Sequence, residues 1–240
     1  MSGSLTVVGT GIGFARLTSE ARAAIEAAEE VLYLVPEPVA AHGIELLNPS
    51  ARSLEHCYVE GEHRRAAYAR MLDEILAPVR AGRRVCAAFY GHPGVFVLPS
   101  HQAISRARSE GYPATMLPGI SAEDCLFADL GIDPADAGCQ SYEATRFLEL
   151  RPAIERQAAL VLWQIGVVGS ANHAAAAEAP KLGALVDLLC ELYSGEHEVV
   201  VYEASQYPGV APLVLRVPLS GLRAAVTPVA TLYVPPLGRS

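Results

Sequence analysis

The sequence from residue 5 to residue 13, Leu-Thr-Val-Val-Gly-Thr-Gly-Ile-Gly, decides the fold. It is a short β-branched run that glycines stop, and a helical pattern rich in Ala and Glu follows over residues 18–30. A second apolar run covers residues 31–35, so this part of the chain predicts one βαβ unit. The glycine-rich turn suits either the close approach of a ligand or a tight turn without one, and the local sequence favours neither interpretation.

The same alternation continues downstream. Apolar runs at residues 85–89 and 114–117 predict two further buried strands, and helical patterns at residues 62–80 and 100–110 separate them. Strands that alternate with helices indicate an α/β fold whose mostly parallel sheet is covered on both faces.

After Pro118 and Gly119 the pattern changes. A helix is predicted at residues 122–130, and closely spaced strands with one long helix follow. This spacing indicates a mixed sheet, so we divide the chain into an N-terminal α/β subdomain, residues 1–117, and a C-terminal α/β subdomain, residues 118–240. A cofactor cleft is expected between the two, since such junctions bind small molecules. The C-terminal strands are predicted at residues 159–163, 199–203, 213–217 and 230–234, and the long helix at residues 181–193.

The composition excludes several classes of function. The 240 residues are 51% hydrophobic, which is enough for a large core, and they carry a net charge of −8 without any run of Lys or Arg. Nucleic acid is therefore not an expected partner. The sequence shows neither a continuous apolar stretch of membrane-spanning length nor a signal peptide. Five scattered cysteines predict buried thiols in a reducing cytoplasm.

Two further motifs combine special residues at predicted strand boundaries. Tyr90-Gly-His-Pro-Gly-Val-Phe96 follows the strand at residues 85–89, and its glycines let the backbone approach a ligand closely. Pro118-Gly-Ile-Ser-Ala-Glu-Asp-Cys125 places Ser121 ahead of a helix whose first turn holds two acids. An N-cap is the plain interpretation of Ser121, and the small residues there also leave room for a flat ligand.

Tyr58, Arg64 and Tyr68 form a third group. Arg64 and Tyr68 are four residues apart at the start of a predicted helix, so they share a face. A guanidinium favours the phenolate of a nearby tyrosine, which can then act as a base. An exposed Arg/Tyr stack without function explains the same spacing, and the local sequence favours that second interpretation.

Taken together, these blocks resemble a known family. The order of the glycine turn, the Tyr90 motif and the Pro118 motif resembles the tetrapyrrole-methylase-like (class III) S-adenosylmethionine methyltransferases. More narrowly, residues 90–101, 116–130 and 231–236 resemble the borosin enzymes. Those are peptide α-N-methyltransferases that methylate backbone amides of a ribosomal precursor.

The resemblance implies a tetrapyrrole-methylase-like fold with the cofactor S-adenosyl-L-methionine, which leaves as S-adenosyl-L-homocysteine. It implies that Tyr58, Arg64 and Tyr68 are catalytic residues around the methyl acceptor and that no metal is needed, and it overturns the local interpretation of that helix. The implied cofactor-binding positions are Tyr90, His92, Val95, Phe96, Ser121, Ala122, Gln164, Val199, Glu203, Ala230 and Thr231.

The chemistry of an amide explains such a catalytic trio. The nitrogen lone pair of a peptide is delocalised into the carbonyl, so methyl transfer requires removal of the N–H proton and stabilisation of a carbonyl oxyanion. One tyrosine would take the proton, while the other phenol or Arg64 holds the oxygen. The sequence does not say which tyrosine is the base.

The resemblance also predicts partners. Fungal members of the family continue into a helical clasp and an apolar core peptide, whereas this chain ends at Ser240. We therefore expect no substrate-peptide tail and a separate precursor peptide that binds in trans. A homodimer is expected on the resemblance alone, without a membrane or nucleic acid as partner.

Three other functions stay open. A porphyrinoid (precorrin-type) C-methyltransferase would share the fold and the cofactor but present a wide, flat acceptor pocket. An NAD(P)-dependent oxidoreductase would use the glycine turn with Glu37 as the ribose-binding acid, although the spacing is G-x-G-x-G rather than G-x-G-x-x-G. A catalytically idle relative would bind a precursor peptide without methyl transfer.

Overall fold

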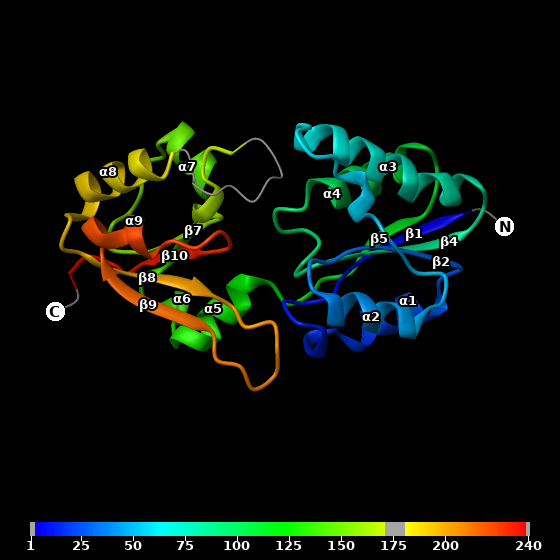
Figure 1. The fold of residues 1–240 in the computed structure, drawn as a ribbon, viewed down its shortest axis with the longest axis horizontal. Helices are drawn as coiled ribbons and strands as arrows, with labels where there is room; N and C mark the ends of the chain where they lie inside the picture. Colours follow the sequence, from blue (N-terminus) through cyan, green and yellow to red (C-terminus); the bar gives the residue numbers. More distant parts are fainter. Residues whose placement is uncertain (1–2, 171–180, 239–240) are drawn as a thin grey trace. The chain divides into compact units, whose positions relative to one another are not determined.

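A computed structural model describes residues 3–170 and 181–238. The chain forms two compact units, each built on a five-stranded sheet (Figure 1). The N-terminal unit comprises residues 1–125 together with residues 205–210, and the C-terminal unit comprises the rest. The sequence predicted the change of organisation at residue 118, whereas the units divide after Cys125, inside helix α5 (Ala122–Leu130).

All strands of the N-terminal sheet run parallel, in the order β3-β2-β4-β1-β5. This confirms the α/β class that the alternating pattern predicted. The apolar runs predicted as strands form β1, β2, β4 and β5, and the two-residue β3 adds an edge that the sequence did not indicate. The bounds are β1 Ser4–Gly9, β2 Glu30–Leu34, β3 Arg52–Ser53, β4 Arg84–Phe89 and β5 Ala114–Met116.

Helices cover both faces of this sheet (Figure 1). The residues of β1 show why: Leu5 and Val7 belong to the core that includes α3 and α4, while Val8 belongs to the core that includes α1 and α2. A strand buried on both faces appears in the sequence as a continuous apolar run. The helix bounds are α1 Ser19–Ala27, α2 Pro38–Leu47, α3 Arg64–Arg80 and α4 Leu98–Ser109, with short helices η1 Phe14–Arg16 and η2 Glu55–Cys57.

Helix α2 was absent from the sequence prediction, and its composition explains the omission. It begins with a proline and contains Gly43, a residue that weakens a helical pattern. A Cβ at Gly43 would lie 2.4 Å from Cε1 of Phe14, so packing against η1 requires a glycine here.

The C-terminal sheet is mixed, as predicted, in the order β6-β7-β10-β8-β9. Strand β6 runs parallel to β7, and the remaining neighbours are antiparallel. The sequence missed β6 because its residues, Cys-Gln-Ser-Tyr-Glu, are mostly polar at an edge of the sheet. The bounds are β6 Cys139–Glu143, β7 Ala159–Trp163, β8 Glu198–Glu203, β9 Leu213–Pro218 and β10 Thr231–Val234.

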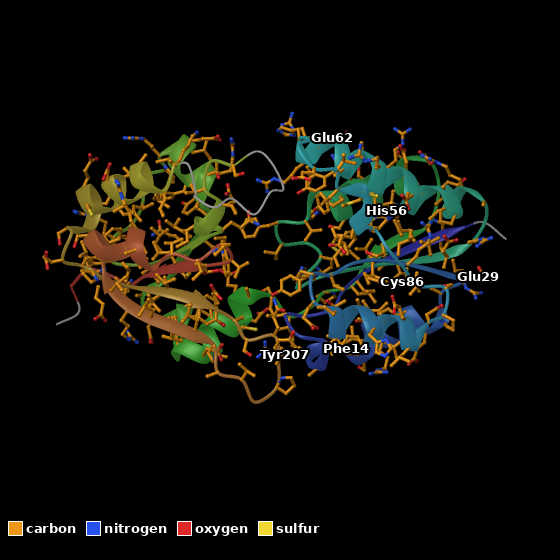
Figure 2. All side chains as sticks on the ribbon, in the orientation of Figure 1. Phe14, Glu29, His56, Glu62, Cys86 and Tyr207 are labelled. Atoms are coloured by element: carbon orange, nitrogen blue, oxygen red, sulfur yellow. The ribbon has the colours of Figure 1, made fainter. Side chains whose placement is uncertain are left out.

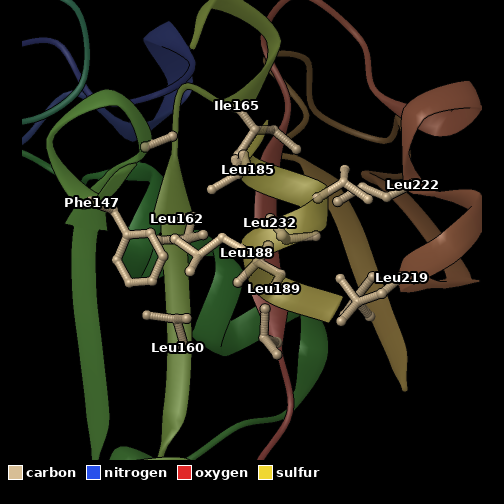
Figure 3. Close-up of a cluster of buried hydrophobic side chains, with 14 of the residues drawn as sticks. Phe147, Leu160, Leu162, Ile165, Leu185, Leu188, Leu189, Leu219, Leu222 and Leu232 are labelled. Carbon is tan, nitrogen blue, oxygen red and sulfur yellow. The ribbon is translucent and has the colours of Figure 1, made fainter. Parts of the chain in front are cut away.

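One face of this sheet packs against helix α8, whose leucines meet those of β7 and β10 (Figure 3). On the other face, α5 reaches β8, where the Tyr202 hydroxyl donates to Asp129 Oδ2 at 2.7 Å. The bounds of the C-terminal helices are α6 Pro134–Ala137, α7 Ala144–Leu150, α8 Leu182–Tyr193 and α9 Leu222–Ala225, with short helices η3 Ile165–Val167 and η4 Leu219–Gly221.

None of the five cysteines forms a disulfide bond, but Cys139 and Cys190 are only half-buried, which corrects the prediction that all five thiols are buried. Cys57, Cys86 and Cys125 are buried. None of the described helices combines the length and apolar character needed to cross a membrane.

Candidate active site

Three loops follow β1, β4 and β5, and their strands end at the same edge of the parallel sheet. Gly11 and Gly91 exchange two backbone hydrogen bonds, with N···O distances of 3.2 and 3.0 Å. At Gly9, a Cβ would lie 2.2 Å from the carbonyl oxygen of Gly91 and 3.0 Å from Cα of Gly119. Three motifs that are far apart in the sequence therefore meet backbone to backbone at the strand ends.

The glycines at this edge are required by the conformation of the backbone. Gly11 and Gly91 have φ angles of +74° and +70°, which side chains rarely permit. A Cβ at Gly119 would lie 2.6 Å from the Gly91 carbonyl oxygen. The edge thus offers main chain without intervening side chains, which is the arrangement that close approach of a ligand needs.

Four of the predicted cofactor-binding residues lie on the loop after β4. Burial raises the pKa of the Tyr90 phenol, although a hydrogen bond from Gln206 opposes the shift. His92 accepts a hydrogen bond at Nδ1 from the Gly94 amide at 2.9 Å. Val95 and Phe96 are 37% and 48% exposed, and Phe96 has a left-handed backbone with φ +57°. Such strain in a non-glycine residue clusters at ligand-binding sites.

Ser121 caps helix α5, as the plain interpretation predicted. Its hydroxyl and amide both donate to Asp124 Oδ2 at 2.7 Å, and the Asp124 amide is 3.2 Å from the Ser121 hydroxyl oxygen. This reciprocal pattern is a capping box with Asp in the usual Glu position. Ser121 is buried and Ala122 half-buried, directly after the Gly119 contact.

The predicted catalytic trio lies on η2 and α3. Tyr58 directly follows η2, and Arg64 and Tyr68 occupy the first turns of α3. All three side chains are half-buried, and both tyrosines pack against the core beneath α3. A hydrogen bond joins the hydroxyls of Tyr58 and Tyr68, and Arg64 is close enough to act electrostatically on Tyr58.

The electrostatics of Tyr58 differ from the sequence argument. Burial raises the pKa of this phenol strongly, and the neighbouring Tyr68 raises it further. Arg64 lowers the pKa as the sequence analysis expected, but burial outweighs it. Tyr58 therefore keeps its proton, so a resting phenolate favoured by Arg64 does not describe this residue.

The C-terminal unit brings four of its five predicted residues to one sheet edge. Gln164 follows β7 and Glu203 ends β8, while Ala230 and Thr231 stand at the start of the antiparallel β10. The register pairs Thr231 with Tyr202, and the Ile165 amide donates to the Ala230 carbonyl at 3.2 Å. Val199 is fully buried in the core about 13 Å along β8, so it does not share this edge.

Two residues at this C-terminal edge have unusual surroundings. Burial raises the pKa of the Glu203 carboxyl, and the Thr227 hydroxyl donates a hydrogen bond to it. Gln164 is exposed and has a left-handed backbone with φ +61°.

The sequence did not predict that residues 205–210 join the N-terminal unit. Arg16 donates to the Ser205 carbonyl at 3.0 Å, and Gln206 bonds Tyr90 and packs over Gly13. Tyr207, labelled in Figure 2, donates to Glu37 Oε1 at 2.9 Å. The position of this segment directly after a strand is the only local signal that could have indicated a role.

Glu37 does not have the role that an NAD(P) site would require. Its carboxylate caps α2 by accepting from the amides of Val39 and Ala40 at 2.8 and 2.7 Å. Although burial raises its pKa, these amides and the Tyr207 hydroxyl lower it on balance. The ribose-binding interpretation is therefore not favoured for this residue, because its oxygens already serve the helix and Tyr207.

Known proteins resemble this chain over nearly its whole length. It is 43% identical over 245 residues to the methyltransferase/ribosomally synthesized cyclic peptide omphalotin A precursor of Omphalotus olearius, covering 99% of this chain and 59% of the relative. It is 42% identical to the gymnopeptides precursor of Gymnopus fusipes, and 42% identical to a type I borosin cyclic peptide precursor of Coprinopsis marcescibilis. These two alignments cover 98% of this chain and 58% and 62% of the relatives. The chain thus spans about three fifths of these proteins, and the resemblance to borosin enzymes is confirmed.

Solved structures share the fold. The uroporphyrin-III-C-methyltransferase from Thermus thermophilus superposes with a TM-score of 0.67 at 22% identity, covering 98% of this chain and 93% of that one. The methyltransferase CobJ gives a TM-score of 0.63 at 18% identity, covering 98% and 95%. Residues 4–210, which include the glycine edge and the tyrosine trio, match the family model of Tetrapyrrole (Corrin/Porphyrin) Methylases. The chain therefore belongs to the tetrapyrrole methylase family.

Proposed function

We propose that this chain is an S-adenosyl-L-methionine-dependent methyltransferase that methylates backbone amide nitrogens of a ribosomal precursor peptide. The relatives that are 42–43% identical carry both a methyltransferase and a cyclic-peptide precursor in their names. The observation that carries the proposal is the half-buried pair of Tyr58 and Tyr68, joined by a hydrogen bond beside Arg64.

A peptide amide demands two functions of such a site. Its nitrogen becomes nucleophilic only when the N–H proton leaves, and the negative charge then moves largely onto the carbonyl oxygen. A base for the proton and a donor for the oxygen must therefore act together.

The environments of the two tyrosines divide these tasks. Tyr58 keeps its proton because burial raises its pKa, so we assign it the role of donor to the carbonyl oxygen. Tyr68 is the other phenol of the pair and shares a face of α3 with Arg64, so we assign it the role of base. As a phenolate, Tyr68 would take the amide proton and become a neutral phenol, and an N–CH3 bond would replace the N–H bond. The methyl group would come from the S–CH3 bond of S-adenosyl-L-methionine, which would leave as S-adenosyl-L-homocysteine.

The sheet edges suit S-adenosyl-L-methionine, whose sulfonium supplies an electrophilic methyl group when it is bound. At the N-terminal edge, the glycine contacts leave bare main chain beside Tyr90 and His92. The exposed Val95 and Phe96 add an apolar surface there, and Ser121 and Ala122 keep the adjoining helix start small. At the C-terminal edge, we propose Gln164, Glu203, Ala230 and Thr231 as contacts.

The first test is a methyl-transfer assay on the purified full chain. Methyl-labelled S-adenosyl-L-methionine is incubated with a synthetic peptide from the part of the Omphalotus olearius relative outside the matched region, or with a low-molecular-weight extract of the source cells. Tandem mass spectrometry then locates the label, which we expect on backbone nitrogens. Label on uroporphyrinogen III, offered in parallel, and none on any peptide would refute the proposal and support the porphyrinoid alternative.

Variants separate the roles of the trio. We expect Tyr58→Phe to lower turnover by about 10²–10³-fold, because one oxyanion donor is lost, while binding of S-adenosyl-L-methionine stays normal. Tyr68→Phe and Arg64→Lys should also lower turnover. Arg65→Lys is the matched control, since Arg65 is exposed in the same turn. Full turnover in both tyrosine variants would refute the assignment.

We also propose that the protein is a homodimer, and strand β9 supports this. Among the described residues β9 pairs only with β8, so its outer edge has unpaired backbone groups. Leu213, Val214 and Leu215 are 39–40% exposed on this edge strand. Apolar residues on an open edge favour pairing with another strand, and antiparallel pairing with the same strand of a second copy closes by two-fold symmetry.

The cytoplasmic location and the separate precursor peptide stay predictions. Five cysteines without a disulfide bond support a reducing, cytoplasmic location, which fractionation of the source cells would test. A separate precursor peptide is tested by comparing label on an added peptide with label on the enzyme itself, since methylation in trans requires the first.

A further inference from the structure

We propose that His56, Cys57 and Glu74 form a binding site for a borderline-soft divalent cation, Zn²⁺ in particular. The three residues come from η2 and α3, and their ligand atoms all lie within 4.8 Å of one another. Imidazole nitrogen, thiolate sulfur and carboxylate oxygen are the atoms that bind Zn²⁺ in proteins. The amide-methylation chemistry proposed above uses none of these three side chains.

The distances between the ligand atoms approach those of a tetrahedral site. Ordinary Zn²⁺ bond lengths place sulfur about 3.5 Å from the other two ligand atoms, and nitrogen about 3.3 Å from oxygen. Cys57 Sγ is 3.5 Å from Glu74 Oε1 and 3.8 Å from His56 Nε2. His56 Nε2 is 2.5 Å from Glu74 Oε1, so these two atoms must part by less than 1 Å to admit the ion. The exposed His56 side chain, labelled in Figure 2, can make that adjustment.

The groups that hydrogen-bond to His56 and Glu74 are of the kind that usually orient metal ligands. His56 Nδ1 lies 3.0 Å from the Ser53 carbonyl, and a proton on Nδ1 leaves the lone pair on Nε2 for a cation. Glu74 Oε2 accepts from Arg52 at 2.7 Å, which orients Oε1 toward His56 and Cys57. Arg52 also pairs with Glu30, so part of its positive charge is compensated.

The site would have an open coordination position. Three protein ligands leave the fourth corner of a tetrahedron for water or another ligand. Binding deprotonates the Cys57 thiol, so an S–metal bond replaces the S–H bond and the proton goes to solvent. Because Tyr58 follows Cys57 directly, a bound ion would also tie the chain at Tyr58 to the middle of α3.

The test is a titration of the tag-free, metal-free full chain with Co²⁺, followed by displacement with Zn²⁺. One equivalent of Co²⁺ should produce thiolate-to-cobalt charge-transfer absorption and tetrahedral ligand-field bands, and Zn²⁺ should abolish both. Cys57→Ser should remove the charge-transfer band, and Glu74→Gln should weaken binding about tenfold or more. Cys190→Ser is the control, because Cys190 is a second thiol without a disulfide bond and lies outside the proposed site.

The outcome does not depend on methyl-transfer activity. His56→Gln provides a second variant that should fold normally, since the side chain is exposed, and it too should weaken Co²⁺ binding. Zn²⁺ should raise the thermal unfolding midpoint of the wild type and of Cys190→Ser, but not that of Cys57→Ser or His56→Gln. Absence of a thiolate–cobalt band in the wild type, or the same band in Cys57→Ser, would overturn the proposal.

Discussion

Replacing Gly9 by alanine should damage both stability and cofactor binding, because Gly9 lies where the three strand-end loops meet. A Cβ there would lie 2.2 Å from the Gly91 carbonyl oxygen, 2.8 Å from Pro93 Cδ and 3.0 Å from Gly119 Cα. Two of the three neighbours are backbone atoms and the third belongs to a proline ring, so rotation of a side chain cannot relieve the overlap. Since ordinary contact begins at 3.4 Å, the loop after β4 must move by more than 1 Å.

The magnitude follows from this displacement. Overpacking of a well-packed site costs about 1–3 kcal/mol in the free energy of unfolding. In a protein of this size each kcal/mol lowers Tm by about 2–4 °C, so Gly9→Ala should lower Tm by about 2–12 °C. The same movement shifts the loop that carries Tyr90 and His92. A misplacement of about 1 Å can lower a reaction rate by about 10²-fold. We expect the affinity for S-adenosyl-L-methionine to fall at least tenfold.

The assay combines thermal unfolding with calorimetric titration of S-adenosyl-L-methionine, performed well below Tm. Gly221→Ala is the matched control, because the nearest atoms to its new Cβ lie at 3.7 and 3.8 Å, in ordinary contact range. This variant should be neutral or stabilised by up to about 1 kcal/mol. If Gly9→Ala kept the wild-type Tm and the wild-type affinity, the close contact of the three loops would be refuted.

Three further predictions follow from other parts of the chain. Asp124→Ala should cost about 1 kcal/mol of unfolding free energy in chemical denaturation, because the α5 cap is lost, whereas Glu123→Ala in the same turn should cost clearly less; equal losses would contradict the capping box. Burial raises the pKa of the Cys86 thiol from 9.0 to about 12, so its stabilising contribution is complete below pH 9. That contribution should fall by about 1.4 kcal/mol per pH unit as pH rises toward 12, because the unfolded chain releases the proton first. The free energy of unfolding of Cys86→Val, measured by chemical denaturation, should therefore fall less steeply with pH than that of the wild type. Equal slopes in the two proteins would contradict this prediction. Leu215→Arg on the β9 edge should shift the protein from dimer to monomer in light scattering, and a wild-type monomer would refute the dimer proposal.

Much of the fold could be predicted because most of its central strands are buried on both faces. A strand such as β4, with Val-Cys-Ala-Ala-Phe in the interior, has no polar face to interrupt the apolar run. The elements that were missed lack this property. Strand β6 is polar at a sheet edge, β3 has two residues, and α2 owes its glycine to a contact with Phe14 that no local pattern reveals.

The candidate site could be predicted motif by motif, but the contacts within it could not. The glycine turn, the Tyr90 motif and the Ser121 cap are each visible locally, since turn and capping residues have local causes. The contact of Gly9 with Gly91 and Gly119 depends on strand order, and that of Gln206 with Tyr90 depends on a segment more than a hundred residues away. Likewise His56 and Cys57 indicate no metal site by spacing alone, because Glu74 reaches them only through the packing of α3 on η2.

Cofactor binding and methyl transfer depend on different kinds of contact, so different substitutions should impair them separately. The glycine edge depends on backbone contacts that tolerate no Cβ, so substitutions there should lower stability and cofactor affinity together. The tyrosine trio stands on η2 and α3 with half-buried side chains, so removing one hydroxyl should leave the core and the cofactor contacts intact. A catalytically idle relative would therefore resemble an extreme form of Tyr58→Phe, which should bind S-adenosyl-L-methionine normally but turn over far more slowly. An active enzyme would differ from that variant in rate alone, because the hydroxyl acts on charge that develops only during proton removal from the amide.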